Sequence, residues 1–293
     1  MALSPARNTV TKKKTNTMDV IHTVRELRER LRAEPRVALV PTMGNLHEGH
    51  IQLIRIVKPK AACLVASIFV NRLQFGPKDD FNKYPRTLPG DSEKLDAAGC
   101  HVVFAPTEEE IYPQPQTFTV EPSSLQNILE GEFRAGHFRG VATVVLKLFN
   151  MVQPQIAIFG KKDYQQYLVL RDMVRQFELP IDIVPAETVR AEDGLALSSR
   201  NGYLSPVERK EAIRLNQQLQ KVRSAIFAGE SDFAKLEQAA VKRLDEYGWK
   251  TDYISVRRQQ DLLTPSRQEK HLVVLGASKL GATRLIDNIE IDL

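Results

Sequence analysis

The amino-acid sequence predicts an α/β protein in which a doubly wound parallel sheet is followed by a smaller C-terminal α+β domain. Two observations lead to this fold class. Over the first two-thirds of the chain, apolar runs of four to eight residues alternate with helical patterns, as in buried parallel strands joined by crossover helices. After Val189, long charged helical stretches come first and extended segments follow them, so strands and helices no longer alternate.

The predicted strands of the parallel sheet are apolar along almost their whole length, as strands covered on both faces must be. They comprise residues 37–40, 63–70, 102–105, 156–159 and 181–184. The predicted helices of this region comprise residues 47–57, 91–98, 138–152 and 163–177. In doubly wound sheets, ligands bind beyond the carboxyl ends of the strands. The residues directly after each strand are therefore the candidates for binding and catalysis.

The C-terminal domain is predicted from a different pattern. Ser205 and Pro206 are typical of a helix start and open a helical stretch to about residue 228; a second covers 231–247. Extended segments follow at 253–256, 271–275 and 282–287. We place the domain boundary in the polar connection near residue 188. The expected parts are then a disordered leader at 1–17, a first domain at 18–188 and a second at 189–293.

Charge and composition exclude several classes of protein. The net charge is +5, but the leader carries four basic and no acidic residues, which leaves +1 for the rest; we therefore expect no nucleic-acid partner. The leader lacks the apolar core of a secretory signal. It is an extension upstream of Met18, a cloning remnant or an organelle-targeting segment. The longest apolar stretch, residues 61–70, is far short of the roughly 20 residues that span a membrane. With only two cysteines, the expected location is the cytoplasm.

The most informative motif, PTMGNLHEGH, occupies residues 41–50 directly after the first strand. A strand that enters a glycine-containing turn and then a helix leaves free backbone N–H groups for an anion. His47 and His50 lie three residues apart and therefore share one helix face. A zinc protease motif needs a spacing of four, and no further metal ligands are nearby. Phosphate binding is favoured over a metal site and over two purely structural histidines.

Three further segments follow predicted strands or the domain boundary. The loop at 71–86 mixes aromatic and polar residues around Gln74 and is either a packed loop or a functional one. In FGKKDYQQ at 159–166, the lysines suit a phosphate, Asp163 suits a ribose, and one of the two glutamines should face the cleft. Ser198, Ser199 and Arg200 place two hydroxyls and a guanidinium where a phosphate chain would lie.

Taken in order, these segments resemble the signatures of the pantothenate synthetase (pantoate–β-alanine ligase) family of the HxGH nucleotidylyltransferase superfamily. The matching segments are PTMGNLHEGH, SIFVNRLQF, YPRT, GHFRGVATVVLKLFN, FGKKDYQQ, DGLALSSRNGYLS and RLIDN. The resemblance runs from about Val37 to the end of the chain. It implies a Rossmann-like first domain that binds nucleotide and pantoate, a C-terminal lid domain, and a homodimer.

The resemblance also implies a reaction. The carboxylate of pantoate attacks the α-phosphate of MgATP and pyrophosphate leaves; the amine of β-alanine then attacks the pantoyl adenylate, giving pantothenate and AMP. A carboxylic acid with a pKa of about 4 is already ionised at neutral pH, so the first step needs no general base. It needs positioning, together with positive charge and donors for the departing pyrophosphate.

Carried over residue by residue, the resemblance assigns catalysis to His47, His50 and Lys162. Gln74 and Gln166 look like the pair that binds pantoate, and Asp91 is the candidate residue on the Mg²⁺ side. The implied ATP-binding residues are Pro41, Met43, His47, His50, Gly160, Lys162, Asp163, Ser198, Ser199 and Arg200.

Three positions depart from the usual family pattern. Arg72 replaces a proline, so the loop that carries Gln74 loses a fixed φ. Lys161 replaces a glutamate and is expected to add positive charge beside the phosphate site. The acidic group after YPRT is reduced to Leu-Pro-Gly90-Asp91.

Two other functions remain as alternatives. A nucleotidyltransferase acting on a phosphorylated acceptor would share the HxGH motif, but would have no use for the paired Gln74 and Gln166. A non-catalytic nucleotide or nucleic-acid binder is disfavoured by the low charge of the body and by the complete set of phosphate-facing groups.

Overall fold

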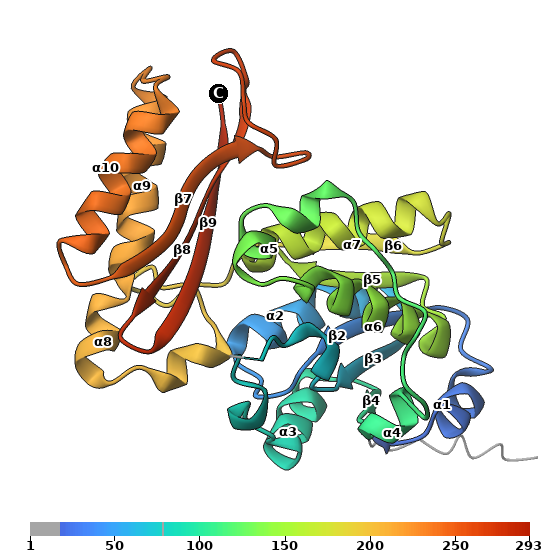
Figure 1. Cartoon of the computed structure of the whole chain (residues 1–293). Helices are drawn as coiled ribbons and strands as arrows, with labels where there is room; N and C mark the ends of the chain where they lie inside the picture. Colours follow the sequence, from blue (N-terminus) through green and yellow to red (C-terminus); the bar gives the residue numbers. More distant parts are fainter. Residues whose placement is uncertain (1–17, 78) are drawn as a thin grey trace, which may run out of the picture.

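The computed structural model describes residues 18–77 and 79–293, so the predicted leader at 1–17 lies outside the described residues. Within these ranges the chain forms a six-stranded parallel sheet and a three-stranded antiparallel sheet (Figure 1). The predicted fold class is confirmed. No helix in the described ranges is both long enough and apolar enough to cross a membrane.

The parallel sheet has the strand order β1-β4-β3-β2-β5-β6. Its strands are β1 (Asp19–Ile21), β2 (Val37–Thr42), β3 (Cys63–Ile68), β4 (Val102–Phe104), β5 (Ile156–Gly160) and β6 (Asp182–Ala186). All but β1 were predicted, because β1 is a three-residue edge strand without an apolar run. The order reverses between β2 and β5, which makes the tips of these two strands the switch point where ligands bind in such sheets.

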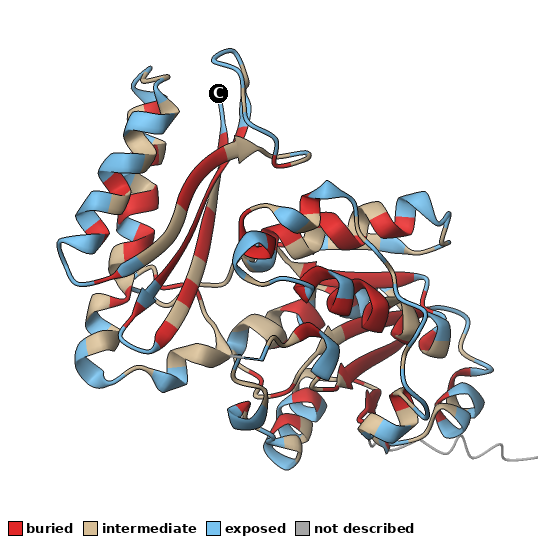
Figure 2. Ribbon diagram, viewed as in Figure 1, coloured by how far each residue is buried: buried red, intermediate tan, exposed pale blue. Residues whose placement is uncertain are grey.

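Helices cover both faces of this sheet, as the alternation of strand side chains requires. Leu39 and Val65 belong to a buried cluster with α1, α6 and α7, whereas Ala38 and Leu64 point to the other face and join α2 and α3. In Figure 2, the strands consist largely of buried residues. The helices are α1 (Val24–Leu31), α2 (Glu48–Val57), α3 (Leu88–Ala98), α4 (Glu108–Ile111), α5 (Glu130–Phe133), α6 (His137–Val152) and α7 (Tyr164–Gln176).

The C-terminal part is a helix-covered antiparallel sheet. It comprises α8 (Pro206–Glu211), α9 (Ile213–Phe227), α10 (Phe233–Asp245), β7 (Lys250–Arg258), β8 (His271–Leu280) and β9 (Thr283–Asp292). The stretch predicted as one helix over 206–228 is therefore two, and the strands are longer than predicted because polar residues continue them. Helices α9 and α10 pack on the sheet (Figure 1). Val273 and Leu275 of β8 join the large buried cluster of the first part, so the two parts share apolar contacts.

Candidate active site

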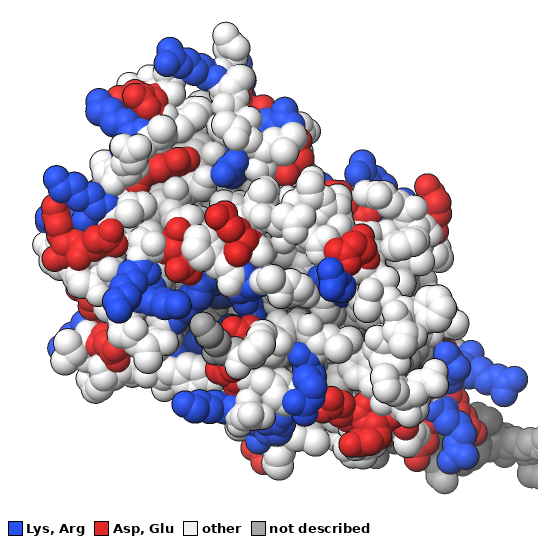
Figure 3. All heavy atoms as spheres, in the orientation of Figure 1, with Lys and Arg blue, Asp and Glu red and all other residues white. Residues whose placement is uncertain are grey.

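A cleft of about 660 Å³ lies between the parallel sheet and the C-terminal sheet. Positively charged side chains gather in this hollow (Figure 3). Those that line it are Lys83, Arg134, Lys162, Arg200, Lys279 and Arg284. Six acidic side chains line the same cleft, namely Asp79, Asp80, Glu130, Asp163, Asp252 and Asp287, so the cleft offers charges of both signs to a ligand.

The turn between β2 and α2 is fixed by a buried carboxylate. Gly44 and Asn45 have φ values of 83° and 51°, and Asp91 of α3 accepts hydrogen bonds from the backbone N–H groups of Asn45 and Leu46, each at 2.8 Å. The Thr87 hydroxyl donates to the same carboxylate at 2.9 Å. Asp91 was expected on the Mg²⁺ side, but it is fully buried and engaged by this turn. Both of its carboxylate oxygens accept hydrogen bonds there, and its place on the Mg²⁺ side stays a prediction.

His47 and His50 stand at the start of α2 with their ring centroids 4.1 Å apart. The Nδ1 atom of His47 accepts from the backbone N–H of Gly49 at 3.1 Å, and that of His50 accepts from the N–H of His47 at 3.3 Å. Since each Nδ1 is an acceptor, the ring proton of each neutral imidazole lies on Nε2. Both histidines therefore offer an N–H donor on the side away from the backbone.

The two imidazoles are neutral at physiological pH. Burial, followed by the charge of Lys162, lowers the pKa of His47 to about 4. Burial, followed by His47, lowers the pKa of His50 to about 3. The positive charge at this end of the cleft therefore comes from lysine and arginine, and the histidines contribute directional donors.

Lys162 and Asp163 lie at the tip of β5, in the short 3-10 turn η5 (Lys161–Asp163) that follows Gly160. The Nζ atom of Lys162 is 3.7 Å from Oδ2 of Asp163. Desolvation alone would raise the pKa of Asp163, but the charge of Lys162 together with those of Arg200 and Arg134 holds that pKa below its ordinary value. The tips of β2 and β5 thus bring the HxGH turn and this ion pair to the same switch point.

Gln74 lies in η2 (Arg72–Gln74) directly after β3, and its orientation is set by Asn71. Asn71 donates through Nδ2 to the carbonyl of Gly140 and to Oε1 of Gln74, both at 3.1 Å. The amide nitrogen of Gln74 is thereby turned toward Met43, 3.2 Å from its sulfur. Gln74 therefore presents a donor beside Met43. Met43 directly follows β2, the strand that contains Pro41.

The two neighbouring glutamines of α7 have different environments. Gln165 is buried and donates to the carbonyls of Leu125 and Ile128 at 2.6 and 2.8 Å. Gln166 is less buried than Gln165, and both line a small cavity together with Lys162 and His137. Because Gln165 is held by these two carbonyls, Gln166 is the glutamine that stays available for the predicted contact with a ligand.

The segment at 198–200 touches the HxGH turn from the C-terminal side. The Ser199 hydroxyl donates to the carbonyl of Asn45 at 3.0 Å, and the Ser198 hydroxyl accepts from the N–H of Arg200 at 3.2 Å. Arg200 forms an ion pair with Asp80, with Nη2 2.9 Å from Oδ1. The structure thus brings this segment to Asn45 of the HxGH turn and to Asp80 in the loop after β3.

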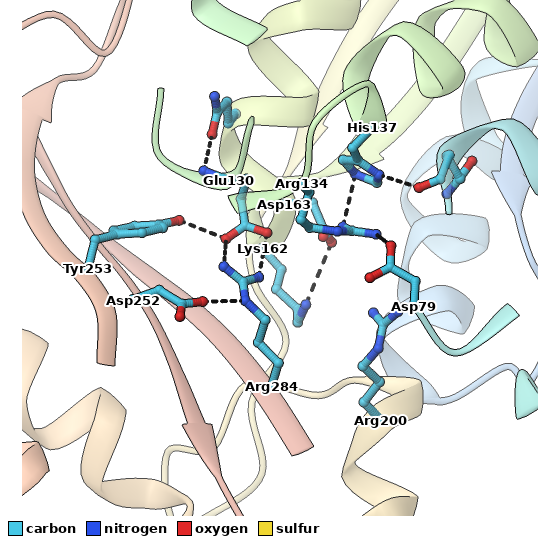
Figure 4. A network of polar contacts seen from close by, with 12 residues as sticks. Asp79, Glu130, Arg134, His137, Lys162, Asp163, Arg200, Asp252, Tyr253 and Arg284 are labelled. Carbon is cyan, nitrogen blue, oxygen red and sulfur yellow. Dashed lines mark hydrogen bonds and ion pairs between the residues drawn. The ribbon is translucent and has the colours of Figure 1, made fainter. Parts of the chain in front are cut away.

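Figure 4 shows a polar network deeper in the cleft. Arg284 of β9 donates to both carboxylate oxygens of Glu130 at 2.7 and 2.8 Å, and to Asp252 at 2.7 Å. Burial alone would raise the pKa of Glu130, but Arg284 holds it below its ordinary value. Sequence reasoning missed this pair, because its members lie 154 positions apart.

A second branch of the network reaches Gln74. Arg134 lies between Asp79, at 3.3 Å, and the Nε2 atom of His137, at 3.1 Å, and His137 in turn contacts the carbonyl of Gln74 through Nδ1 at 2.8 Å. Sequence reasoning also passed over Asn71, although its position directly after β3 was a usable signal.

The departures from the family pattern have structural explanations. Arg72 forms a two-bond ion pair with Glu108 and lies 4.2 Å from the centre of the Phe81 ring, so side-chain contacts tether the loop that has lost its proline. Lys161 was expected to add charge beside the phosphates. Instead it pairs with Glu187 and Glu290, each at 2.6 Å, and its charge is neutralised there. Gly90 has open space around its α-carbon, so nothing in the packing requires glycine.

Comparisons with known proteins agree with one another. A model of the pantoate–β-alanine ligase family matches residues 16–290. A pantothenate synthetase from Nitrosospira multiformis is 58% identical over 274 residues, which cover 94% of this chain and 98% of that protein.

Solved structures show the same likeness. The pantothenate synthetase of Thermus thermophilus is 44% identical with a TM-score of 0.89, covering 94% of this chain and all of that one. A pantoate–β-alanine ligase of Francisella tularensis, complexed with beta-gamma ATP and β-alanine, is 32% identical with a TM-score of 0.80, covering 93% of this chain and 97% of that one. With a family model that spans nearly the whole chain and relatives of this similarity, the chain belongs to the pantoate–β-alanine ligase family.

Proposed function

We propose that the cleft binds ATP and pantoate and joins pantoate to β-alanine in two steps, through pantoyl adenylate. Family membership supplies the overall reaction, an ATP-dependent ligation that yields pantothenate, AMP and pyrophosphate. The observation that carries the proposed mechanism is the pair of neutral Nε2–H donors of His47 and His50 beside Lys162.

The catalytic groups are His47, His50 and Lys162. The two imidazoles donate hydrogen bonds to the phosphate oxygens, and Lys162 supplies a charge that stabilises the departing pyrophosphate. Because the attacking carboxylate of pantoate is ionised at neutral pH, no residue has to remove a proton in this step. The remaining groups assigned to ATP are Pro41, Met43, Gly160, Asp163, Ser198, Ser199 and Arg200.

Pantoate is held by Gln74 and Gln166. The contacts of Asn71 turn the amide N–H₂ of Gln74 toward Met43, so this side chain donates to an oxygen of pantoate. His137 contacts the backbone of Gln74 and lines the same small cavity as Gln166, which supports a shared pocket.

Mg²⁺ enters with ATP in this proposal. The ion typically keeps several waters and is bound by substrate phosphates with one or two carboxylates. The described residues contain no group of three or more His, Cys, Asp or Glu side chains suited to a metal ion, while Asp79 and Asp80 line the cleft. A metal carried mainly by the nucleotide fits these residues, and it would neutralise phosphate charge there.

We further propose that β-alanine is the second substrate, as the complex of the Francisella tularensis ligase suggests. The family resemblance also favours a homodimer, and the polar connection near residue 188 favours a division of the chain there. A cytoplasmic location is favoured by the cysteines. The two cysteines, Cys63 and Cys100, are free and buried, in keeping with a reducing compartment.

The mechanism is tested with pantoate labelled with ¹⁸O in its carboxyl group. Incubation with ATP and Mg²⁺ alone should release pyrophosphate in a burst of about one equivalent per site, and added β-alanine should then give AMP that carries one ¹⁸O atom. Unlabelled AMP would rule out the acyl adenylate, and pyrophosphate release that ignores pantoate would rule out the proposed first step.

A further inference from the structure

The RLIDN segment of β9 holds the backbone of the proposed catalytic lysine. Asn288 is buried and donates both hydrogens of its side-chain amide, one to the carbonyl of Lys161 at 2.8 Å and one to the carbonyl of Lys162 at 2.9 Å. The two carbonyls belong to the peptide planes before and after the α-carbon of Lys162. Fixing both planes fixes the direction in which the Lys162 side chain leaves the backbone.

A second contact between the same two elements reinforces the first. Glu290, two residues further along β9, accepts from Lys161 Nζ at 2.6 Å and from the Tyr164 hydroxyl at 3.0 Å. Strand β9 therefore contacts residues on both sides of Lys162 in the sequence, Lys161 in η5 and Tyr164 at the start of α7. The position of this lysine, which the first domain carries, is tied to the sheet of the C-terminal part.

We infer that Asn288 is a positioning residue for adenylation, acting through Lys162. This inference rests on the proposed function of Lys162. It also gives Lys161 a role: in this chain, the residue that departs from the family pattern strengthens the contact between η5 and β9.

The test is a double-mutant cycle on pyrophosphate release in single-turnover experiments with ATP, Mg²⁺ and pantoate. Asn288→Ala should lower the rate roughly 10- to 100-fold, the loss that misplacement of a catalytic group produces, and should change the KM for pantoate less than about twofold. In the Lys162→Ala background, the same substitution should cost less than about twofold, because coupled residues are not additive.

Asp292→Asn serves as the matched control, since Asp292 lies on the same strand but contacts His271 and Gln259. If Asn288→Ala does not fold, Lys161→Met breaks the contacts with Glu290 and Glu187. It should slow adenylation about threefold, again only where Lys162 is present.

Equal losses in both backgrounds, a wild-type rate for Asn288→Ala, or a matching rise in the KM for pantoate would overturn the inference while leaving the proposed function intact. A wild-type rate for Lys162→Ala alone would overturn the proposed role of Lys162, and the inference with it.

Discussion

The two walls of the cleft are built on different physical principles. The sheet wall, by which we mean the HxGH turn and η2, lies beside the lining residues Ser198 and Arg200 and presents neutral imidazole and amide donors. Their orientation is set by hydrogen bonds within a few residues or to the buried Asp91. The C-terminal wall, formed by the 190–203 connection and the β8–β9 hairpin, is fixed by ion pairs such as Arg284–Glu130 and Arg190–Asp287. The sheet wall thus depends on locally oriented neutral donors, whereas the C-terminal wall depends on paired charges.

The largest expected effect lies on the sheet wall. His50→Ala should slow pyrophosphate release by about 10²- to 10³-fold, because a preorganised donor to the phosphates is lost, while the fold is retained. His271→Ala, an exposed histidine outside the cleft, is the matched control. A wild-type burst from His50→Ala would remove this residue from the mechanism.

Substitutions in the C-terminal wall should mainly change the free energy of unfolding. Arg284→Met leaves the buried Glu130 and the half-buried Asp252 without their partner, which should lower the free energy of unfolding by about 3 kcal/mol. Arg209→Met breaks the more exposed pair with Asp193 and should lower it by less than about 1 kcal/mol. Urea unfolding of both variants checks the contrast, and equal losses would contradict a buried, stabilising network.

A smaller effect, on KM, should distinguish pantoate binding from ATP binding at the sheet wall. Gln74→Ala should raise the KM for pantoate about tenfold, because a hydrogen bond to a charged group is lost, and leave the KM for ATP nearly unchanged. Steady-state kinetics with each substrate varied in turn would show this. Equal increases in both constants would argue against the pantoate pocket.

The smallest effect is expected at Arg72. Arg72 is the first residue of η2, a position that accepts proline. Asn71 before it is extended, with φ −84° and ψ 110°, as a residue that precedes proline must be. Arg72→Pro restores the family residue and should change kcat/KM for pantoate less than about twofold. A loss above about fivefold would show that the tether to Glu108 positions Gln74.

Sequence alone predicted the sheet wall better than the C-terminal wall, because its chemistry is local. His47, His50 and the turn before them are contiguous, and strand alternation predicted where they lie. The role of Asp91 was missed because its partner Asn45 is 46 positions away. The environment of Lys161 was wrongly predicted because Glu290 is 129 positions away. Contacts between residues so far apart in the sequence become visible only when the fold brings the two residues together.

The contrast between the walls also predicts how the protein responds to acid. The pKa values of His47 and His50 lie at about 4 and about 3 in the folded chain and at about 6.5 in an unfolded one. Between these values the unfolded chain binds protons that the folded chain does not, so stability should fall as the pH drops from 6.5 toward 4.

At the centre of the proposed mechanism, the sheet wall offers neutral imidazoles to the phosphates of ATP. An NMR titration of the histidine ring signals from pH 8 to pH 4, assigned with His47→Gln and His50→Gln, tests this most directly. We expect both rings to stay neutral down to about pH 5, with the proton on Nε2. Titration of either ring near its ordinary pKa of about 6.5 would contradict the mechanism and make that histidine a cationic phosphate ligand.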